Sequence, residues 1–147
     1  MARFITTVTS PQPAAAVFDL LADMTNTPHW DPGVLAAEQT AGDGGGLDAT
    51  FTVTVSGWPK PLAMVYETVA YERPHRVRLR AETARLRSDD EITVAAHGSG
   101  CSITYAAELE LTGWARFADP LLRPIFRRIG NAAAVGLAGM VDARALR

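Results

Sequence analysis

Apolar and polar residues alternate along much of this chain, and alternation with a period of two is typical of β-strands that bury one face. The clearest example is residues 50–55, where Phe51, Val53 and Val55 are separated by threonines. The same pattern predicts strands at residues 2–9, from Val34 onward, and at 62–71, 76–81, 92–96 and 102–111. Since the connecting turns are short, we expect an antiparallel sheet in which consecutive strands are neighbours.

The hydrophobic period lengthens to that of a helix at two places. Near the N-terminus a serine and two prolines precede an apolar cluster at 17–21, which predicts a helix that runs to Asp23. In the last third of the chain, Asp119 and Pro120 predict the start of a long helix, whose expected inward stripe is Ile125, Ile129, Ala133, Gly136 and Met140. Pro124 should kink its first turn or delay its start. One sheet with a single buried face and one long helix against it predicts a curved α+β fold.

The segment between the first helix and the sheet reads Asn-Thr-Pro-His-Trp-Asp-Pro at 26–32. Its two prolines predict a stiff bend, which allows one further short helical turn. Trp30 is expected either to line a cavity or to close the core against the C-terminal helix. Asp31 is expected to cap a helical turn through backbone N–H groups. His29 has no acid or nucleophile at a telling spacing, so we expect it to be exposed and without a chemical role.

Composition narrows the class of protein. The chain has 147 residues and a formal net charge of −2, so we expect a single domain, residues 1–147, with no electrostatic reason to bind nucleic acid or an anionic membrane. Cys101 is the single cysteine, and neither a signal peptide nor a membrane-spanning stretch is visible, so a cytoplasmic protein without disulfides is expected. The three histidines are far apart, and the glycine-rich loop at 42–46 lacks the lysine of a phosphate loop. We therefore expect no metal and no cofactor.

Two segments carry a family resemblance: "ADMTNTPHWDP" at 22–32 and "GSGCSITYAAELELTG" at 98–113. With the order of elements around them, the chain resembles the SRPBCC superfamily over essentially its whole length, and within it the bacterial polyketide cyclase/dehydrase-like branch. The resemblance implies a START-like helix-grip fold: a curved seven-stranded antiparallel sheet wrapped around the long C-terminal helix, with short helices after the first strand. It also implies a cavity open at one end and small hydrophobic ligands, but a fold alone does not identify a reaction.

Side chains on the concave face of the sheet, on the bend and on the C-terminal helix are the candidates for lining that cavity. They are Trp30, Phe51, Val53, Met64, Tyr66, Leu79, Asp90, Ile92, Tyr105, Leu109, Ile129 and Ala133. The strand at 62–71 is ambiguous; we prefer its Met64, Tyr66 and Thr68 face inward, because the other face, which includes Tyr71, would bury Glu67. The small residues of 131–140 either leave space for a ligand or allow close helix–sheet packing.

Two polar candidates have alternative explanations. Tyr105 would orient a ligand carbonyl, or bond to a backbone carbonyl or a water. At the rim of an apolar cavity Asp90 would have a raised pKa and serve as an acid or base, but its polar neighbours favour a solvated entrance to the strand that contains Ile92. The opposite, outward face of the sheet is expected to pair charges across strands, through Arg76, Arg78 and Arg80 with Glu108 and Glu110.

Three functions follow from these patterns. We favour a module that binds a small hydrophobic molecule, lipid-like or aromatic and polyketide-like, in an internal cavity. The first alternative is a polyketide cyclase or dehydratase, although the sequence shows no paired catalytic groups and we assign no catalytic residue. The second is a protein-interaction module with a vestigial cavity, which uses its outer sheet or the surface around Trp58 and Trp114. We expect a monomer or homodimer that neither binds nucleic acid nor inserts stably into a membrane.

Overall fold

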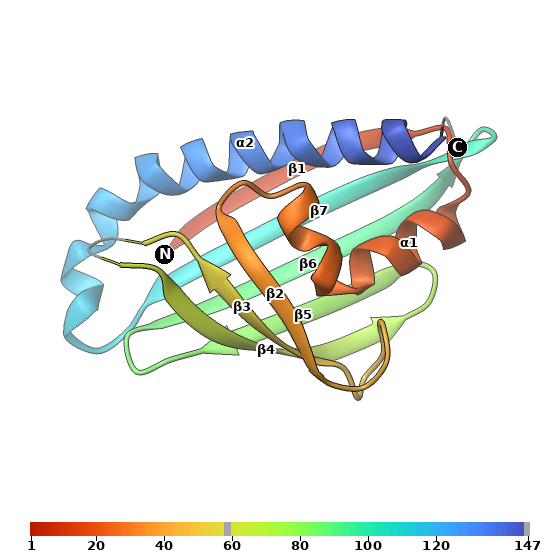
Figure 1. Ribbon diagram of the computed structural model, residues 1–147. Coiled ribbons are helices and arrows are strands. Elements are labelled where there is room, and N and C mark those ends of the chain that lie inside the picture. Colours follow the sequence, from red (N-terminus) through yellow and green to blue (C-terminus); the bar gives the residue numbers. More distant parts are fainter. Residues whose placement is uncertain (58–59, 146–147) are drawn as a thin grey trace.

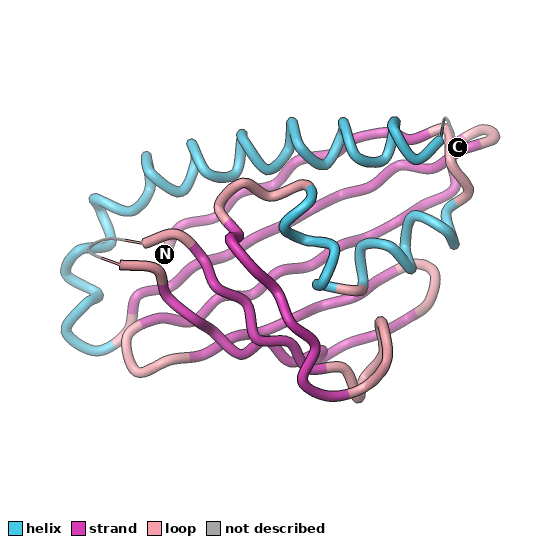
Figure 2. The backbone as a smooth tube through the Cα atoms, in the orientation of Figure 1, coloured by secondary structure: helices cyan, strands magenta, loops and turns pink. Residues whose placement is uncertain are grey.

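The computed structural model describes residues 1–57 and 60–145 and shows a seven-stranded antiparallel sheet with helices over one face (Figures 1 and 2). The strands are β1 (Ala2–Ser10), β2 (Val34–Ala41), β3 (Thr50–Val55), β4 (Leu62–Glu72), β5 (Arg76–Glu82), β6 (Leu86–His97) and β7 (Gly100–Leu111). The helices are α1 (Ala14–Ala22), α2 (Asp119–Ala145) and two short 3₁₀ helices, η1 (Met24–His29) and η2 (Gly113–Ala118). The predicted helix-grip fold is confirmed. Trp58, one of the two tryptophans assigned to an interaction surface, lies outside the described residues.

Strands β2 to β7 follow one another in space as they do in sequence, and β1 pairs with β7. The order is β1-β7-β6-β5-β4-β3-β2, so β1 and β2 form the two edges of the sheet. Figure 1 shows α2 lying along β1, while α1 and η1 cover the same face further across, α1 mainly over β6 and η1 over β2. This arrangement leaves a space between the concave face, α2 and the η1–β2 corner, where the candidate site lies.

The preferred face of β4 is confirmed, since its buried residues are Met64, Tyr66 and Thr68. Tyr71 at the end of the same strand was expected on the outward face, and that expectation is wrong. The β4–β5 register shifts between Thr68 and Ala70, and the bulge reverses the alternation beyond it. Tyr71 therefore turns inward, where its ring centroid lies 5.5 Å from that of Phe18.

Strand β6 begins at Leu86, earlier than the predicted start at Ile92. The polar run before Ile92 is therefore regular strand, and the solvated entrance predicted there is wrong. Asp90 lies well inside the sheet, in register with Leu79 of β5 and Ala107 of β7. Charged residues alternate here just as apolar ones do elsewhere, with Asp90 on the concave face and its neighbours on the outer one.

The outer face pairs arginines with acids, as predicted, but with different acids. Arg80 Nε lies 2.7 Å from Asp89 Oδ1, and the Arg76 guanidinium lies 2.9 Å from a Glu91 carboxylate oxygen. Glu108 pairs instead with Arg3, at 3.4 Å. The predicted partners on β7 were wrong because β6 lies between β5 and β7 in the sheet.

The buried face of α2 also differs from the predicted stripe. Ile125 is 57 % exposed and Ile129 41 %, whereas the buried residues of α2, as far as residue 142, are Gly130, Ala133, Leu137 and Val141. The helix runs through Pro124 without a delayed start. Its orientation is fixed by β1, because the ring of Phe4 occupies the space that a side chain at position 130 would need. Within the described part of the chain, no helix is both long and apolar enough to cross a membrane.

Candidate functional site

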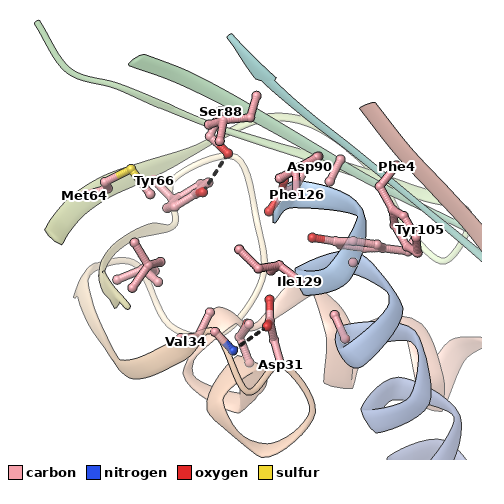
Figure 3. Close-up of a pocket in the computed structure, with 18 of the residues that line it drawn as sticks. Phe4, Asp31, Val34, Met64, Tyr66, Ser88, Asp90, Tyr105, Phe126 and Ile129 are labelled. Carbon is pink, nitrogen blue, oxygen red and sulfur yellow. Dashed lines mark hydrogen bonds between the residues drawn. The ribbon is translucent and has the colours of Figure 1, made fainter. Parts of the chain in front are cut away.

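A cavity of about 170 Å³ lies between the concave face of the sheet, α2 and the η1–β2 corner (Figure 3). Its apolar wall includes Phe4, Val34, Val53, Met64, Leu109, Phe126, Ile129 and Ala133. Its polar wall includes Asp31, Tyr66, Ser88, Asp90 and Tyr105. Two lining residues, Ser56 and Ile129, are also exposed to solvent, so the mouth of the cavity lies between the end of β3 and α2.

Eight of the twelve candidate residues border this cavity, and they come from five different elements. They are Val53, Met64, Tyr66, Asp90, Tyr105, Leu109, Ile129 and Ala133. The other four belong to the buried hydrophobic core and do not border the cavity: Trp30, Phe51, Leu79 and Ile92. Alternation identifies inward-facing positions, but it does not tell which of them meet another side chain and which meet open space.

The Tyr66 and Ser88 hydroxyls are hydrogen-bonded across the buried wall, with 2.9 Å between Tyr66 Oη and Ser88 Oγ (Figure 3). Both residues are buried. Burial, and next the nearby charge of Asp90, hold the pKa of Tyr66 far above its usual range. Tyr66 therefore stays protonated, and its hydroxyl serves as a fixed polar contact rather than as a base.

Asp90 is the most strongly perturbed carboxyl of the cavity. Its pKa is raised to about 7, mainly by removal from water and next by the charges of Asp31 and Asp89, while an interaction with the Tyr105 hydroxyl opposes part of the rise. Figure 3 shows Asp90 and Tyr105 on the same side of the cavity. Near neutral pH the carboxyl is thus divided between its neutral and charged forms, so it can either donate or accept a proton.

Asp31 is a cavity residue that sequence reasoning missed. It was expected only to cap a helical turn, but its Oδ1 accepts a hydrogen bond from the backbone N–H of Gly33, at 2.9 Å, in the non-helical turn that precedes β2. Its carboxyl also borders the cavity, on the opposite side from Asp90 in Figure 3. Burial raises the pKa of Asp31 as well. No strand alternation exists at the bend, so its sequence carried no signal for the direction of this side chain.

Trp30 closes the core behind the cavity. Its ring meets the Tyr105 ring edge-on, with 5.4 Å between the centroids, and only 4 % of the residue is exposed. The backbone of Trp30 lies against α2 at Gly136, where an added Cβ would come within 2.8 Å of the Trp30 carbonyl carbon. Trp30 thus packs against the Tyr105 ring and restricts its position. His29 is exposed, as expected.

The charges of the two cavity aspartates have no opposite charge beside them among the described residues. Within that part of the chain, the lining includes Asp31 and Asp90 but no lysine, arginine or histidine. In the described ranges 1–57 and 60–145, no three His, Cys, Asp or Glu residues are grouped so that they could hold a metal ion. Cys101 is fully buried, and burial raises the pKa of its thiol, so it offers no nucleophile to the cavity.

The chain matches a protein family over nearly its whole length: the model described as "Polyketide cyclase / dehydrase and lipid transport" covers residues 1–142. No curated protein matches the chain in sequence.

Solved structures of similar shape come from bacteria and plants. The protein TTHA0849 of Thermus thermophilus superposes with a TM-score of 0.76 at 16% identity, over 95% of this chain and 96% of that one. A START superfamily protein of Mycobacterium smegmatis gives a TM-score of 0.71 at 12% identity, over 96% and 97% of the two chains. The ginseng major latex-like protein 151 of Panax ginseng gives 0.64 at 12% identity, over 95% and 97%. At such identities the likeness concerns the fold alone.

Proposed function

Because the chain belongs to the polyketide cyclase / dehydrase and lipid transport family, we propose that its cavity binds a small, mainly apolar molecule with one polar end. The observation that carries this proposal is the cavity itself: a largely apolar wall, a few convergent polar groups and an opening beside α2. Apolar burial would supply most of the affinity, at roughly 25 cal/mol per Å². A protein-interaction module with a vestigial cavity would be expected to have filled this space with side chains.

The size of the cavity limits the ligand. Its volume of about 170 Å³ is close to the roughly 150 Å³ of an engineered protein cavity that binds benzene. We infer that the enclosed part of the ligand is about the size of one aromatic ring or a short branched chain. Anything larger would extend through the mouth between Ser56 and Ile129.

The polar groups of the cavity suggest which end of the ligand points inward. A charged Asp90 accepts a hydrogen bond from a hydroxyl or an amine, and the Tyr105 hydroxyl beside it is available as a second contact. Met64 and Val53 face the same space and would contact the apolar body. The expected ligand is therefore an aromatic or aliphatic molecule with a hydroxyl or amino group at its buried end.

We expect 2-naphthol to bind in this cavity and Ala133→Leu to weaken its binding by at least about tenfold, or 1.4 kcal/mol. Ala133 is 2 % exposed and borders the cavity, so a leucine there would occupy the ligand's space. The control is Ala132→Leu, because Ala132 is the preceding residue of α2 and is exposed. Amide chemical shifts in NMR titrations measure the affinity and also locate the bound probe.

Two outcomes would contradict the binding proposal. One is that 2-naphthol shifts no resonance of the cavity residues. The other is that both leucine variants bind it as the wild-type protein does.

A comparison with 2-methylnaphthalene, which lacks the hydroxyl, tests the polar contact separately: Asp90→Asn should reduce the preference for 2-naphthol. Native mass spectrometry of the protein from its own host would then identify the natural ligand.

A second candidate function is acid–base catalysis on such a molecule, and one observation favours it. Asp90 borders the cavity with a pKa of about 7, which lies near the optimum for proton transfer at neutral pH. The test is to incubate the wild-type protein and Asp90→Asn with a small-molecule extract of the host and to compare the compounds by mass spectrometry. A compound consumed only by the wild-type protein supports catalysis, and unchanged extracts leave binding as the function.

A further inference from the structure

We propose that η2 and the first turns of α2 form a docking surface for an anionic lipid bilayer. The surface consists of Trp114, Phe117, Leu121 and Ile125 with Arg116, Arg123, Arg127 and Arg128, and we call it the η2–α2 surface. It lies at one end of the molecule (Figure 1). Ile129, which borders the mouth of the cavity, follows it on α2. The proposal does not depend on the ligand proposed above.

Large apolar side chains are unusually exposed on this surface. Trp114 is 69 % exposed, Phe117 77 %, Leu121 73 % and Ile125 57 %. Leu121 and Ile125 are four residues apart on α2 and share one face of the helix. Four large apolar side chains this exposed, within twelve residues of η2 and α2, favour an interaction site over ordinary surface. The four side chains would lose their contact with water if they entered the interfacial region of a bilayer.

The charges around these side chains indicate an anionic partner. Residues 112–130 contain four arginines and one aspartate, a net charge of +3, although the whole chain carries −2 and the remainder therefore −5. The aspartate, Asp119, is already paired with the N-terminal amino group and lies 4.0 Å from Arg123. Arg127 and Arg128 are exposed and have no ion-pair partner among the described residues. The net charge of the chain had given no reason to expect an anionic membrane, because it averages over this asymmetry.

The combination of exposed apolar side chains with arginines favours a bilayer over a protein partner. Aromatic and aliphatic side chains flanked by arginines are typical of helices that lie in the membrane interface, where the guanidinium groups reach the phosphates. The Arg85 and Arg116 guanidinium groups already lie 4.9 Å and 5.2 Å from the rings of Trp114 and Phe117. A second copy of this chain would bring its own arginines against these in a two-fold contact. The negative remainder of the molecule would be repelled by the bilayer, which fixes the orientation of docking.

The position of the surface connects docking with the cavity. Ile129 follows Leu121 and Ile125 at the same four-residue spacing, is itself 41 % exposed and borders the cavity. The apolar stripe thus leads from the proposed membrane contact to the cavity mouth. When the protein is docked, the mouth of its cavity would face the lipid. An apolar ligand could then pass between the cavity and the bilayer with little exposure to water.

The test is sedimentation of the protein with vesicles, either pure phosphatidylcholine or phosphatidylcholine mixed with phosphatidylglycerol. We expect binding to the mixed vesicles that weakens as salt is added. Arg127→Glu/Arg128→Glu and Leu121→Glu/Ile125→Glu should each weaken it by at least about tenfold. The matched control is Val65→Glu, because Val65 is 53 % exposed but lies on the outer face of β4. Circular dichroism checks that each variant is folded.

Several outcomes would overturn the proposal. They are no binding to either vesicle, equal binding to both, unchanged binding of the arginine variant, or an equal loss in Val65→Glu. Analytical ultracentrifugation tests the alternative that a second copy of this chain occupies the surface. If the wild-type protein is a dimer and Leu121→Glu/Ile125→Glu a monomer, the surface is an interface between two copies and the membrane proposal is wrong.

Discussion

Gly136→Ala should lower the melting temperature by roughly 5–10 °C, because the added methyl group has no space. A Cβ at this position would overlap the Trp30 carbonyl group, which is backbone and cannot turn away. Relief requires α2 to move from the η1–β2 corner, and overpacking of this kind costs about 1–3 kcal/mol. The displacement would also disturb Tyr105, since the Trp30 ring packs edge-on against it.

Gly139→Ala is the matched control on the same helix. Nothing lies within 4 Å of a Cβ built at Gly139, so the substitution adds only helix propensity and should stabilise the protein by up to about 1 kcal/mol. Thermal unfolding followed by circular dichroism measures both variants. Equal melting temperatures for the two variants would show that α2 does not pack closely against Trp30.

Asp90→Asn should stabilise the protein strongly at alkaline pH and hardly at all at pH 4. The pKa of Asp90 is raised to about 7 in the folded protein, against about 3.9 for an aspartate in an unfolded chain. Between these two values the folded state holds a proton that the unfolded state has released, so the free energy of unfolding falls as pH rises. At 1.36 kcal/mol for each pH unit, the accumulated loss above pH 7 is on the order of 4 kcal/mol. Asparagine has nearly the same shape but does not titrate, so the free energy of unfolding of Asp90→Asn does not fall for this reason as pH rises.

The measurement is chemical denaturation of both proteins at several pH values. The difference in unfolding free energy should grow between about pH 4 and pH 7 and remain constant above, and taking the difference cancels the other titrating groups. Asp43→Asn, at an exposed site in the glycine-rich loop, controls for the loss of one negative charge. A pH-independent difference would mean that Asp90 is solvated and charged throughout, and its role as an acid or base would then have no basis.

Some of the candidate site could be predicted from single residues. The position of Asp90 on the concave face follows from its parity with Ile92, and the inward face of β4 follows from the cost of burying Glu67. The predictions for Tyr71 and Ile125 were wrong because strand alternation and helical periodicity did not decide which way these side chains point. Tyr71 lies beyond a bulge, which no residue type announced. Ile125 satisfies the helical period, but the face that α2 buries is decided by Phe4 and Trp30, which are distant in sequence.

The sequence by itself determined the strands, the two main helices and the order of β2 to β7, because alternation and turn chemistry act over a few residues and each of these strands pairs with the next. The pairing of β1 with β7, instead of with β2, was decided by the tertiary structure. The placement of Asp31 and Asp90 around one cavity was decided only by the tertiary structure, which brings a bend and the middle of a distant strand together. So was the division of the inward residues between solid core and cavity wall. Empty space is what remains after all side chains are placed, and that remainder has no pattern along the chain.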